Sequence, residues 1–285
     1  MSSPERGIRT RTSATRVAAA DGWDCHVHVF DAGRPVRPGH YEPAHRPLAE
    51  VQALARAHGV GRLVLVQPSV YGTDHEVLLQ ALRAGGDAHR GVAAFDPGID
   101  DAGLDAMHAA GVRGVRLNLV SPVGATAQVL AEVPRLSPRL RERGWHLQWY
   151  VGADALPAVA DARRALGDAA PPFVLDHLAG LRADLPRRHP AWTALAALAD
   201  AGAWVKLSGW YRLGDDAPYL RLVGHLEEVA RRFGDRLVWG SDWPHTSFPP
   251  DASPDYASLW EPVLAVLGAA RARRIRSQAP LRLYG

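Results

Sequence analysis

The stretch Asp24-Cys25-His26-Val27-His28-Val29-Phe30 has the pattern of a buried strand that ends in polar side chains. Side chains alternate between the two faces of an extended chain, so His26 and His28 are predicted to share one face. Two imidazoles at this spacing can bind a metal or donate two N–H groups to one oxygen. Taken alone, the stretch favours a polar strand that carries two unrelated histidines, and motifs further along the chain favour a functional site instead. The apolar residues predicted on the opposite face are Trp23, Cys25, Val27 and Val29.

Downstream, short apolar runs alternate with amphipathic segments along the chain. A continuous apolar run such as Leu63-Val64-Leu65-Val66 is typical of a strand covered on both faces, which indicates a parallel sheet packed by helices. Eight strands alternating with eight helices predict the α/β class and a single-domain (β/α)₈ TIM barrel over residues 21–285. The rival architecture, a doubly wound sheet, usually has a glycine-rich dinucleotide turn after its first strand, and this sequence has none there. Further strands are predicted over 62–67, 91–95, 112–119, 145–151, 173–175, 204–208 and 237–241, and helices over 48–58, 74–84, 100–111, 128–143, 153–166, 192–201, 218–233 and 256–267.

Length and composition fit a globular protein with a large core. The chain has 285 residues, 47% of them apolar, and a formal net charge of +3. Its basic residues are arginines apart from Lys206, and no arginine cluster alternates with aromatic residues, so we predict no nucleic-acid partner. The single cysteine, Cys25, excludes an internal disulfide and fits a reducing compartment. No apolar run is long enough to cross a membrane, so we expect a cytoplasmic protein with no membrane partner. Residues 1–20 are predicted to form a flexible N-terminal arm rather than a signal peptide.

Two later motifs place polar side chains where barrel enzymes carry their active sites, at the carboxyl ends of the strands. One is Leu175-Asp176-His177 and the other is Trp239-Gly240-Ser241-Asp242-Trp243-Pro244-His245. We therefore expect the first two histidines, His177 and Asp242 to meet at one mouth of the barrel. Other polar residues expected at strand ends are Gln67, Ser69, Arg116, Asn118, His146, Gln148, Tyr150, Lys206, Ser208 and Arg212.

In their order and spacing, these motifs resemble the amidohydrolase superfamily of barrel hydrolases. Within it, the sequence is most similar to the branch that contains 2-pyrone-4,6-dicarboxylate lactonase and related lactone hydrolases. The resemblance extends from about residue 21 to the end of the chain. The further matching stretches are Val66-Gln67-Pro68-Ser69, Gly114-Val115-Arg116-Leu117-Asn118 and Val205-Lys206-Leu207-Ser208-Gly209.

The resemblance implies hydrolysis of the ring ester of a small lactone, with aromatic- or sugar-acid catabolism as the setting. Asp242 would act as general base on water, since a carboxylate is ionised at neutral pH. His26, His28 and His177 would stabilise the oxyanion, either directly or through one metal ion that they bind together with Asp242. The cofactor is accordingly predicted to be either none or a single divalent metal, with zinc favoured. A second metal is not expected, because the strand-four lysine of two-metal relatives is missing.

The resemblance also assigns substrate-binding residues. Arg116 and Arg212 match arginines that would bind a substrate carboxylate, because the guanidinium fork fits both oxygens. The basic residues expected after Asn118 and after His177 are missing, which favours a lactone with one carboxylate, or a sugar-derived lactone. Arg116 could instead form a structural ion pair, and Arg212 could pair with Asp215 or Asp216. The remaining predicted contacts of the substrate are Tyr41, Ser69, Gln148, Tyr150 and His245.

Two other functions remain open from the sequence. A metal-dependent nonoxidative decarboxylase of the same superfamily would cleave a C–C bond, but that group often has an acidic residue where this chain has His26. A non-catalytic barrel that serves as a binding module should lack one of the four key residues, and none is missing. A homodimer is compatible with the sequence, although no segment marks an interface.

Overall fold

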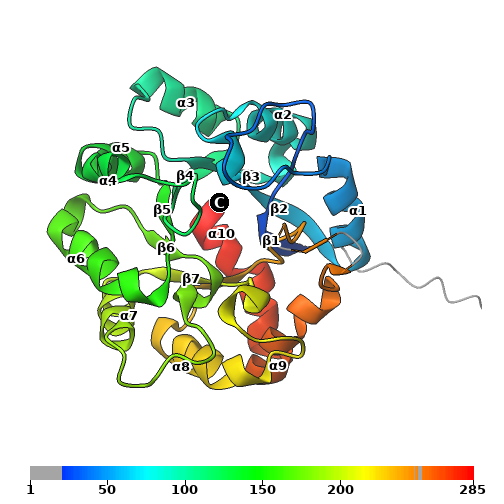
Figure 1. Ribbon diagram of the computed structural model, residues 1–285, viewed down its shortest axis with the longest axis vertical. Coiled ribbons are helices and arrows are strands. Elements are labelled where there is room, and N and C mark those ends of the chain that lie inside the picture. The colour runs from blue at the N-terminus through cyan, green and yellow to red at the C-terminus, as the bar shows by residue number, and fades with distance from the viewer. Residues whose placement is uncertain (1–20, 247, 250–251) are drawn as a thin grey trace, which may run out of the picture.

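The computed structural model describes residues 21–246, 248–249 and 252–285. Its eight strands form one parallel sheet in the order β1-β2-β3-β4-β5-β6-β7-β8, which curls into a ring surrounded by helices (Figure 1). The predicted TIM barrel is therefore confirmed. The predicted arm at 1–20 lies outside the described residues. Within those residues, no helix is both long and apolar enough to span a bilayer.

The element bounds follow the predicted alternation closely. The predicted helix over 128–143 is divided in two at Glu132, and the last predicted helix is longer and is followed by another. The strands are β1 (Gly22–Val27), β2 (Val60–Val66), β3 (Arg90–Ala94), β4 (Val112–Asn118), β5 (His146–Tyr150), β6 (Phe173–Leu175), β7 (Trp204–Leu207) and β8 (Leu237–Trp239). The helices are α1 (Leu48–Ala57), α2 (Glu76–Gly85), α3 (Asp101–Ala109), α4 (Ala127–Ala131), α5 (Val133–Glu142), α6 (Leu156–Leu166), α7 (Ala191–Asp200), α8 (Val223–Phe233), α9 (Glu261–Ser277) and α10 (Ala279–Tyr284).

The strand β1 does not alternate regularly. Its pairing with β2 shifts register, since Asp24 lies opposite Leu63 while Val27 lies opposite Leu65. The extra residue of such a bulge moves the following side chains to the other face. Trp23 and Cys25 therefore pack in the same apolar cluster as the last helix, whereas Val27 packs in the outer cluster between sheet and helices. The prediction that these residues share one face was wrong, because regular alternation was assumed through the bulge.

The barrel closes where the segment after β8 meets β1. The backbone N–H of Asp242 donates to the carbonyl of His26 at 2.8 Å, and the N–H of His28 donates to the carbonyl of Trp243 at 2.8 Å. The carboxylate of Asp24 strengthens this closure by accepting the N–H of Ser241 at 2.9 Å. These backbone hydrogen bonds alone place Asp242 beside His26 and His28.

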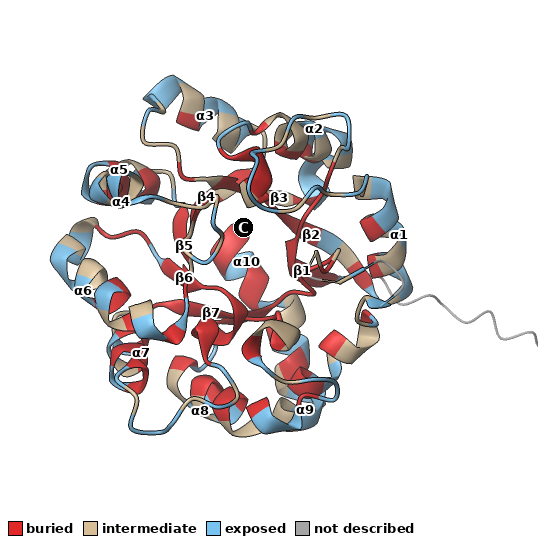
Figure 2. Cartoon of the chain, in the orientation of Figure 1, coloured by how far each residue is buried: buried red, intermediate tan, exposed pale blue. Residues whose placement is uncertain are grey.

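The helix α10 fills the centre of the ring at the end opposite the strand C-termini (Figure 1). Tyr284 is fully buried there, stacks on Trp23 with ring centroids 6.1 Å apart, and meets His146 edge-on at 5.3 Å. The strands are buried along most of their length, while the surrounding helices expose their outer faces (Figure 2). One end of the barrel is therefore closed by an apolar plug, and the carboxyl end of the strands remains for polar side chains.

Candidate active site

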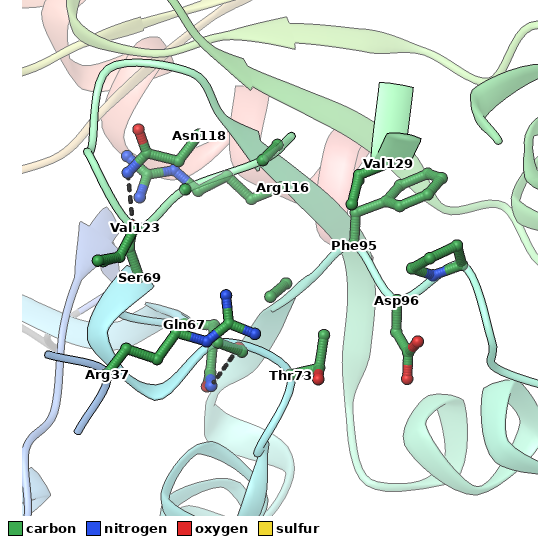
Figure 3. Close-up of a pocket in the computed structure, with 15 residues that line it drawn as sticks. Arg37, Gln67, Ser69, Thr73, Phe95, Asp96, Arg116, Asn118, Val123 and Val129 are labelled. Atoms are coloured by element: carbon green, nitrogen blue, oxygen red, sulfur yellow. Dashed lines mark hydrogen bonds between the residues drawn. The ribbon is translucent and has the colours of Figure 1, made fainter. Parts of the chain in front are cut away.

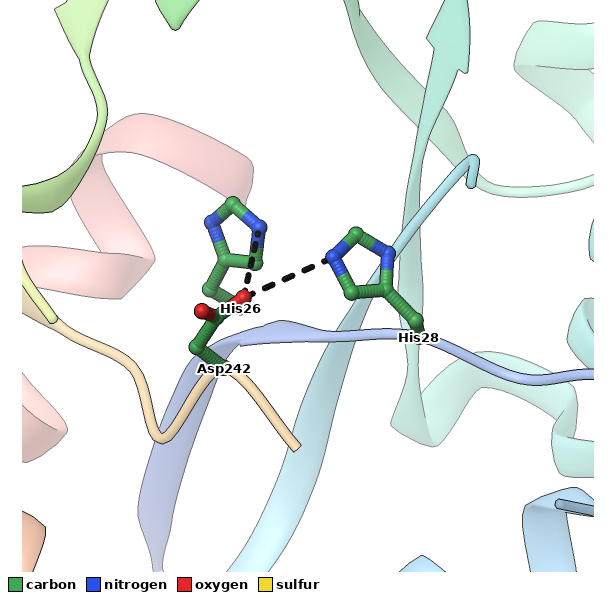
Figure 4. A group of neighbouring side chains, drawn as sticks. All are labelled: His26, His28 and Asp242. Atoms are coloured by element: carbon green, nitrogen blue, oxygen red, sulfur yellow. Dashed lines mark ion pairs between the residues drawn. The ribbon is translucent and has the colours of Figure 1, made fainter. Parts of the chain in front are cut away.

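Three imidazoles converge on one oxygen of a buried carboxylate at the carboxyl end of the barrel. The Oδ1 atom of Asp242 lies 3.7 Å from Nε2 of His26 and 3.6 Å from Nε2 of His28 (Figure 4). The Nε2 atom of His177 lies 4.0 Å from the same oxygen. All four side chains are almost completely buried. The structure thus brings together the four residues predicted as the catalytic set.

The second ring nitrogen of each histidine has its own partner. The Nδ1 atom of His28 lies 2.7 Å from the carbonyl oxygen of Val66, which can only accept, so Nδ1 carries the proton. Nδ1 of His177 lies 3.0 Å from Ser208 Oγ, and Nδ1 of His26 lies 3.3 Å from a carboxylate oxygen of Asp176. A ring that carries its one proton on Nδ1 has the lone pair of Nε2 pointing toward the Asp242 carboxylate.

This arrangement is typical of a cation site. Metal-binding histidines usually donate their other N–H to a carboxylate, a carbonyl or a similar acceptor, as these three can. Two buried atoms at the centre, His26 Nε2 and Asp242 Oδ1, have no hydrogen-bond partner among the described residues. His26, His28 and Asp242 together could hold a metal ion. Burial lowers the pKa of His26 well below its usual value and that of His177 to about 4, so both rings are neutral and able to bind a cation.

The other oxygen of Asp242 is held by two donors. Oδ2 accepts hydrogen bonds from the hydroxyl of Tyr211 at 2.6 Å and from Nε of Arg212 at 2.6 Å. Burial alone would raise the pKa of Asp242, but the Arg212 guanidinium holds that pKa well below its usual range. The carboxylate is therefore ionised and fixed in orientation. The sequence offered Asp215 or Asp216 as the alternative partner of Arg212 and did not indicate this pairing with Asp242.

Behind His26 lies a buried charge network centred on Asp176. Its Oδ2 accepts hydrogen bonds from Arg116 Nε at 2.8 Å and from Gln148 Nε2 at 3.0 Å. Its Oδ1 lies 3.8 Å from Nζ of Lys206, which donates to the carbonyl of Cys25 at 2.9 Å. Burial lowers the pKa of Lys206 to about 8, while the nearby carboxylate acts in the opposite direction. The network supports the His26 ring from the side away from the cavity.

Two glycines allow the close approaches that the site requires. A Cβ atom on Gly240 would lie 2.5 Å from the Cβ of His26, so only glycine lets β8 meet β1 here. Gly209 has a φ of +59° and lies against the His177 ring, where an added Cβ would come within 2.5 Å of Nδ1. Both positions are therefore closed to larger residues by backbone geometry and space.

A cavity of about 120 Å³ opens onto Asp242, His28 and His177, whereas His26 lies behind its wall. Of the predicted substrate contacts, Gln148 and His245 do not line it: Gln148 binds Asp176, and Nε2 of His245 lies 3.2 Å from the carbonyl of Ser241. Their assignment to the substrate stays a prediction. The predicted site residues that line the cavity are His28, Tyr41, Ser69, Arg116, Tyr150, His177, Arg212 and Asp242.

Sequence reasoning gave no role to Tyr211, Asp176 or Lys206. The signals were present, since Asp176 lies inside the Leu-Asp-His motif and Lys206 is the only lysine of the chain. Tyr211 follows the end of β7 by a few residues, in a loop without a periodic pattern. Only its contact with Asp242 reveals its place in the site.

Comparison with known proteins agrees with this geometry. A family model described as amidohydrolase matches residues 23–285. A 2-pyrone-4,6-dicarboxylate hydrolase of Comamonas testosteroni is 31% identical over 92% of this chain and 89% of its own length. A 4-sulfomuconolactone hydrolase of Rhizobium radiobacter is 30% identical over 99% of this chain and 96% of its own length. A crystal structure from Pseudomonas putida, proposed to be a 2-pyrone-4,6-dicarboxylic acid hydrolase, is 31% identical with a TM-score of 0.82, over 93% of this chain and 98% of that one.

Proposed function

The chain belongs to the amidohydrolase family, and from this premise we propose that it is a hydrolase that opens the ring ester of a small lactone. The family and the lactonase-like branch are those that its motifs resemble. One observation carries the proposal beyond family membership. Three imidazole nitrogens surround one oxygen of a buried, ionised carboxylate at the carboxyl end of the barrel, within 4.0 Å. A small-molecule lactone is the expected partner, and the barrel of residues 21–285 is the catalytic unit.

In the proposed reaction, Asp242 accepts a proton from a water molecule in the cavity. The oxygen of that water forms a bond to the lactone carbonyl carbon, and the ring C–O bond then breaks. The ring oxygen takes up the proton that Asp242 received and leaves as the hydroxyl of the product, a hydroxy acid, so the Asp242 carboxylate is restored. Tyr211 and Arg212 keep Oδ2 engaged, so that Oδ1 is the oxygen left to carry the proton.

For the oxyanion, the ring tautomers favour one of the two routes that the sequence left open. Because Nδ1 of His28 donates to the carbonyl of Val66, the single proton of an imidazole ring is used there, which leaves Nε2 as a ligand rather than a donor to the oxyanion. Nε2 of His26, His28 and His177 with Oδ1 of Asp242 would instead hold one divalent cation, zinc by its preference for nitrogen ligands. When bound, that cation supplies a Lewis acid for the lactone carbonyl.

Arg116 and Arg212 are proposed to bind the charged substituent of the substrate. Both line the cavity, although each also holds a buried carboxylate through Nε. A guanidinium has five N–H donors, so each arginine can bind a ligand through some of them and keep its protein partners through others. Two arginines at one small cavity fit a lactone with a single carboxylate. The absence of basic residues directly after Asn118 and after His177 also favours a substrate with a single carboxylate.

The proposal is tested by acid release from a panel of aliphatic, sugar-derived and aromatic-derived lactones, with and without a chelator. Asp242→Asn should lower kcat by about 10²–10⁴-fold, because the base is lost, while binding of the product acid changes little. Asparagine tolerates the left-handed backbone of this position, where φ is +64°, so the fold should persist. Chelation should remove activity together with bound zinc, and added zinc should restore it.

The matched control is Asp184→Asn, the same change at an exposed residue paired with Arg182. It should keep full activity. Undiminished turnover by Asp242→Asn would reject the base assignment, and full activity of zinc-free protein would reject the cation. Release of carbon dioxide from hydroxybenzoates, without lactone hydrolysis, would favour the decarboxylase instead.

A further inference from the structure

A second cavity lies beside the catalytic one, over the ends of β2, β3 and β4. Its volume is about 240 Å³, about twice that of the catalytic cavity at about 120 Å³. Figure 3 shows Arg37, Gln67 and Thr73 along one side, and Phe95 and Val129 along another. None of these five residues lines the catalytic cavity. The neighbouring space is therefore separate from the proposed chemistry and is large enough for part of a ligand.

The two cavities share a wall of three residues, Ser69, Arg116 and Asn118. The side-chain amide of Asn118 donates to Ser69 Oγ at 2.6 Å and so bridges the ends of β4 and β2. Its carbonyl oxygen accepts the backbone N–H groups of Val120 at 3.1 Å and Ser121 at 3.0 Å, which fixes the amide in place. A ligand in the catalytic cavity would therefore reach the second cavity across a short polar bridge rather than through a packed core.

Gln67 is a fixed part of the wall of the second cavity. It is only 2% exposed, and its Nε2 donates to the carbonyl oxygens of Gly72 at 3.2 Å and Asp74 at 2.7 Å. These two bonds hold the amide in place, and its Oε1 is fully buried. The groups left to bind a ligand are therefore the charged side chains that line the cavity.

The charges around the cavity balance. The guanidinium of Arg37 lies against Gly72, where any Cβ would clash with it, and no partner is found for its side chain within the described part of the chain. The carboxylate of Asp96 lines the same cavity and accepts the N–H of Gly98 at 2.9 Å. A carboxylate ligand would be attracted by Arg37 and repelled by Asp96. A neutral hydroxyl can accept a hydrogen bond from Arg37 and donate one to Asp96.

We propose that this cavity is a second subsite, which binds a hydroxyalkyl arm attached to the lactone ring. The inference rests on the proposed lactone hydrolysis and names its substrate class. The ring lies in the catalytic cavity, and the arm crosses the Ser69–Asn118 bridge. Its methylene groups pack on Phe95 and Val129, and its terminal hydroxyl accepts a hydrogen bond from Arg37 and donates one to Asp96.

The test uses three γ-butyrolactones, unsubstituted or carrying a propyl or a hydroxypropyl arm, and two variants that spare the catalytic cavity. Ala125→Leu fills the subsite, and Arg37→Gln removes its cation. Wild-type kcat/KM should be about tenfold higher for the hydroxypropyl than for the propyl lactone. Ala125→Leu should lower kcat/KM about tenfold for the propyl and the hydroxypropyl lactone. It should leave kcat/KM for the unsubstituted lactone unchanged. Arg37→Gln should lower kcat/KM for the hydroxypropyl lactone only.

The matched control is Ala155→Leu, the same change at a half-buried alanine in an apolar cavity elsewhere on the barrel. It should change none of these values. The subsite is overturned if Ala125→Leu affects all three lactones equally or affects none of them.

A binding measurement separates failure of the subsite from failure of the hydrolase proposal. If no lactone is hydrolysed by the wild type, the proposed function fails, and the subsite is judged by calorimetry with the dihydroxy acid that ring opening would give. Its Kd should rise about tenfold in Ala125→Leu and stay constant in Ala155→Leu. Equal Kd values in both variants, or no binding to the wild type, would reject the subsite.

Discussion

At the scale of single residues, the central feature is a carboxylate whose two oxygens have different surroundings. Oδ2 of Asp242 is engaged by Tyr211 and Arg212, while Oδ1 faces three imidazoles and has no hydrogen-bond partner in the part of the chain that the structure describes. In the proposed reaction, Oδ1 is therefore the oxygen that takes a proton from water. In that reaction Tyr211 would act through Asp242, as a positioning residue.

Tyr211→Phe should lower kcat about tenfold with little change in KM, because one neutral hydrogen bond to the base is lost while the cavity keeps its shape. The measurement is steady-state kinetics on the best lactone of the panel. Tyr219→Phe removes a hydroxyl outside the cavity and should leave both constants unchanged. A rise in KM without a fall in kcat would place Tyr211 in substrate binding and contradict the positioning role.

At the scale of elements, β1 and α10 set the two ends of the barrel. The bulge in β1 lets Cys25 join the central apolar cluster while His26 faces the carboxylates. The helix α10 completes that cluster through Tyr284, whose ring is fully buried. The apolar plug supports the polar mouth, because Trp23 of the plug and His26 of the mouth belong to the same strand.

Tyr284→Ala should lower the free energy of unfolding by about 3–5 kcal/mol, since a buried aromatic ring leaves a cavity. Tyr284→Phe should be neutral or stabilising, because the buried hydroxyl has no hydrogen-bond partner to lose within the described residues. Urea unfolding followed by tryptophan fluorescence measures both. Equal losses in the two variants would show that the hydroxyl, rather than ring packing, stabilises the plug.

At the scale of the whole molecule, several histidines are buried in neutral form. Burial lowers the pKa of His146 to about 3 and that of His89 to about 4. In the unfolded chain these groups titrate near 6.5, so below that pH the unfolded state binds more protons than the folded state. Their contribution to stability is complete above about pH 6.5 and is lost as the pH falls toward 4.

His146→Leu should make the free energy of unfolding less dependent on pH between about 6.5 and 4. One fully buried histidine with this pKa accounts for a loss on the order of 3 kcal/mol between pH 6.5 and 4, as an upper bound. Urea unfolding of wild type and variant at several pH values between 4 and 7 measures the difference. Parallel pH profiles would contradict the assignment of a neutral, buried His146 to this effect.

Most of the barrel could be predicted because its signals are local. Apolar runs, turn residues and helical spacing lie within short segments, so they gave eight strands and the polar side chains at their ends. Where a structural feature depends on contacts between distant parts of the chain, the prediction was wrong or none was made. The bulge in β1 depends on pairing with β2, and α10 depends on an apolar ring that exists only after all strands have closed.

By itself, the sequence determined the alternation of elements, the barrel, and the identity of the histidines and the aspartate at its mouth. Only the tertiary structure decided that Tyr211 and Arg212 hold Asp242, that Asp176 supports His26, and that a second cavity lies across the Ser69–Asn118 bridge. The physical reason is distance along the chain. Each of these contacts joins segments about 30 or more residues apart, and their side-chain geometry is set by strand register and packing, which no local pattern encodes.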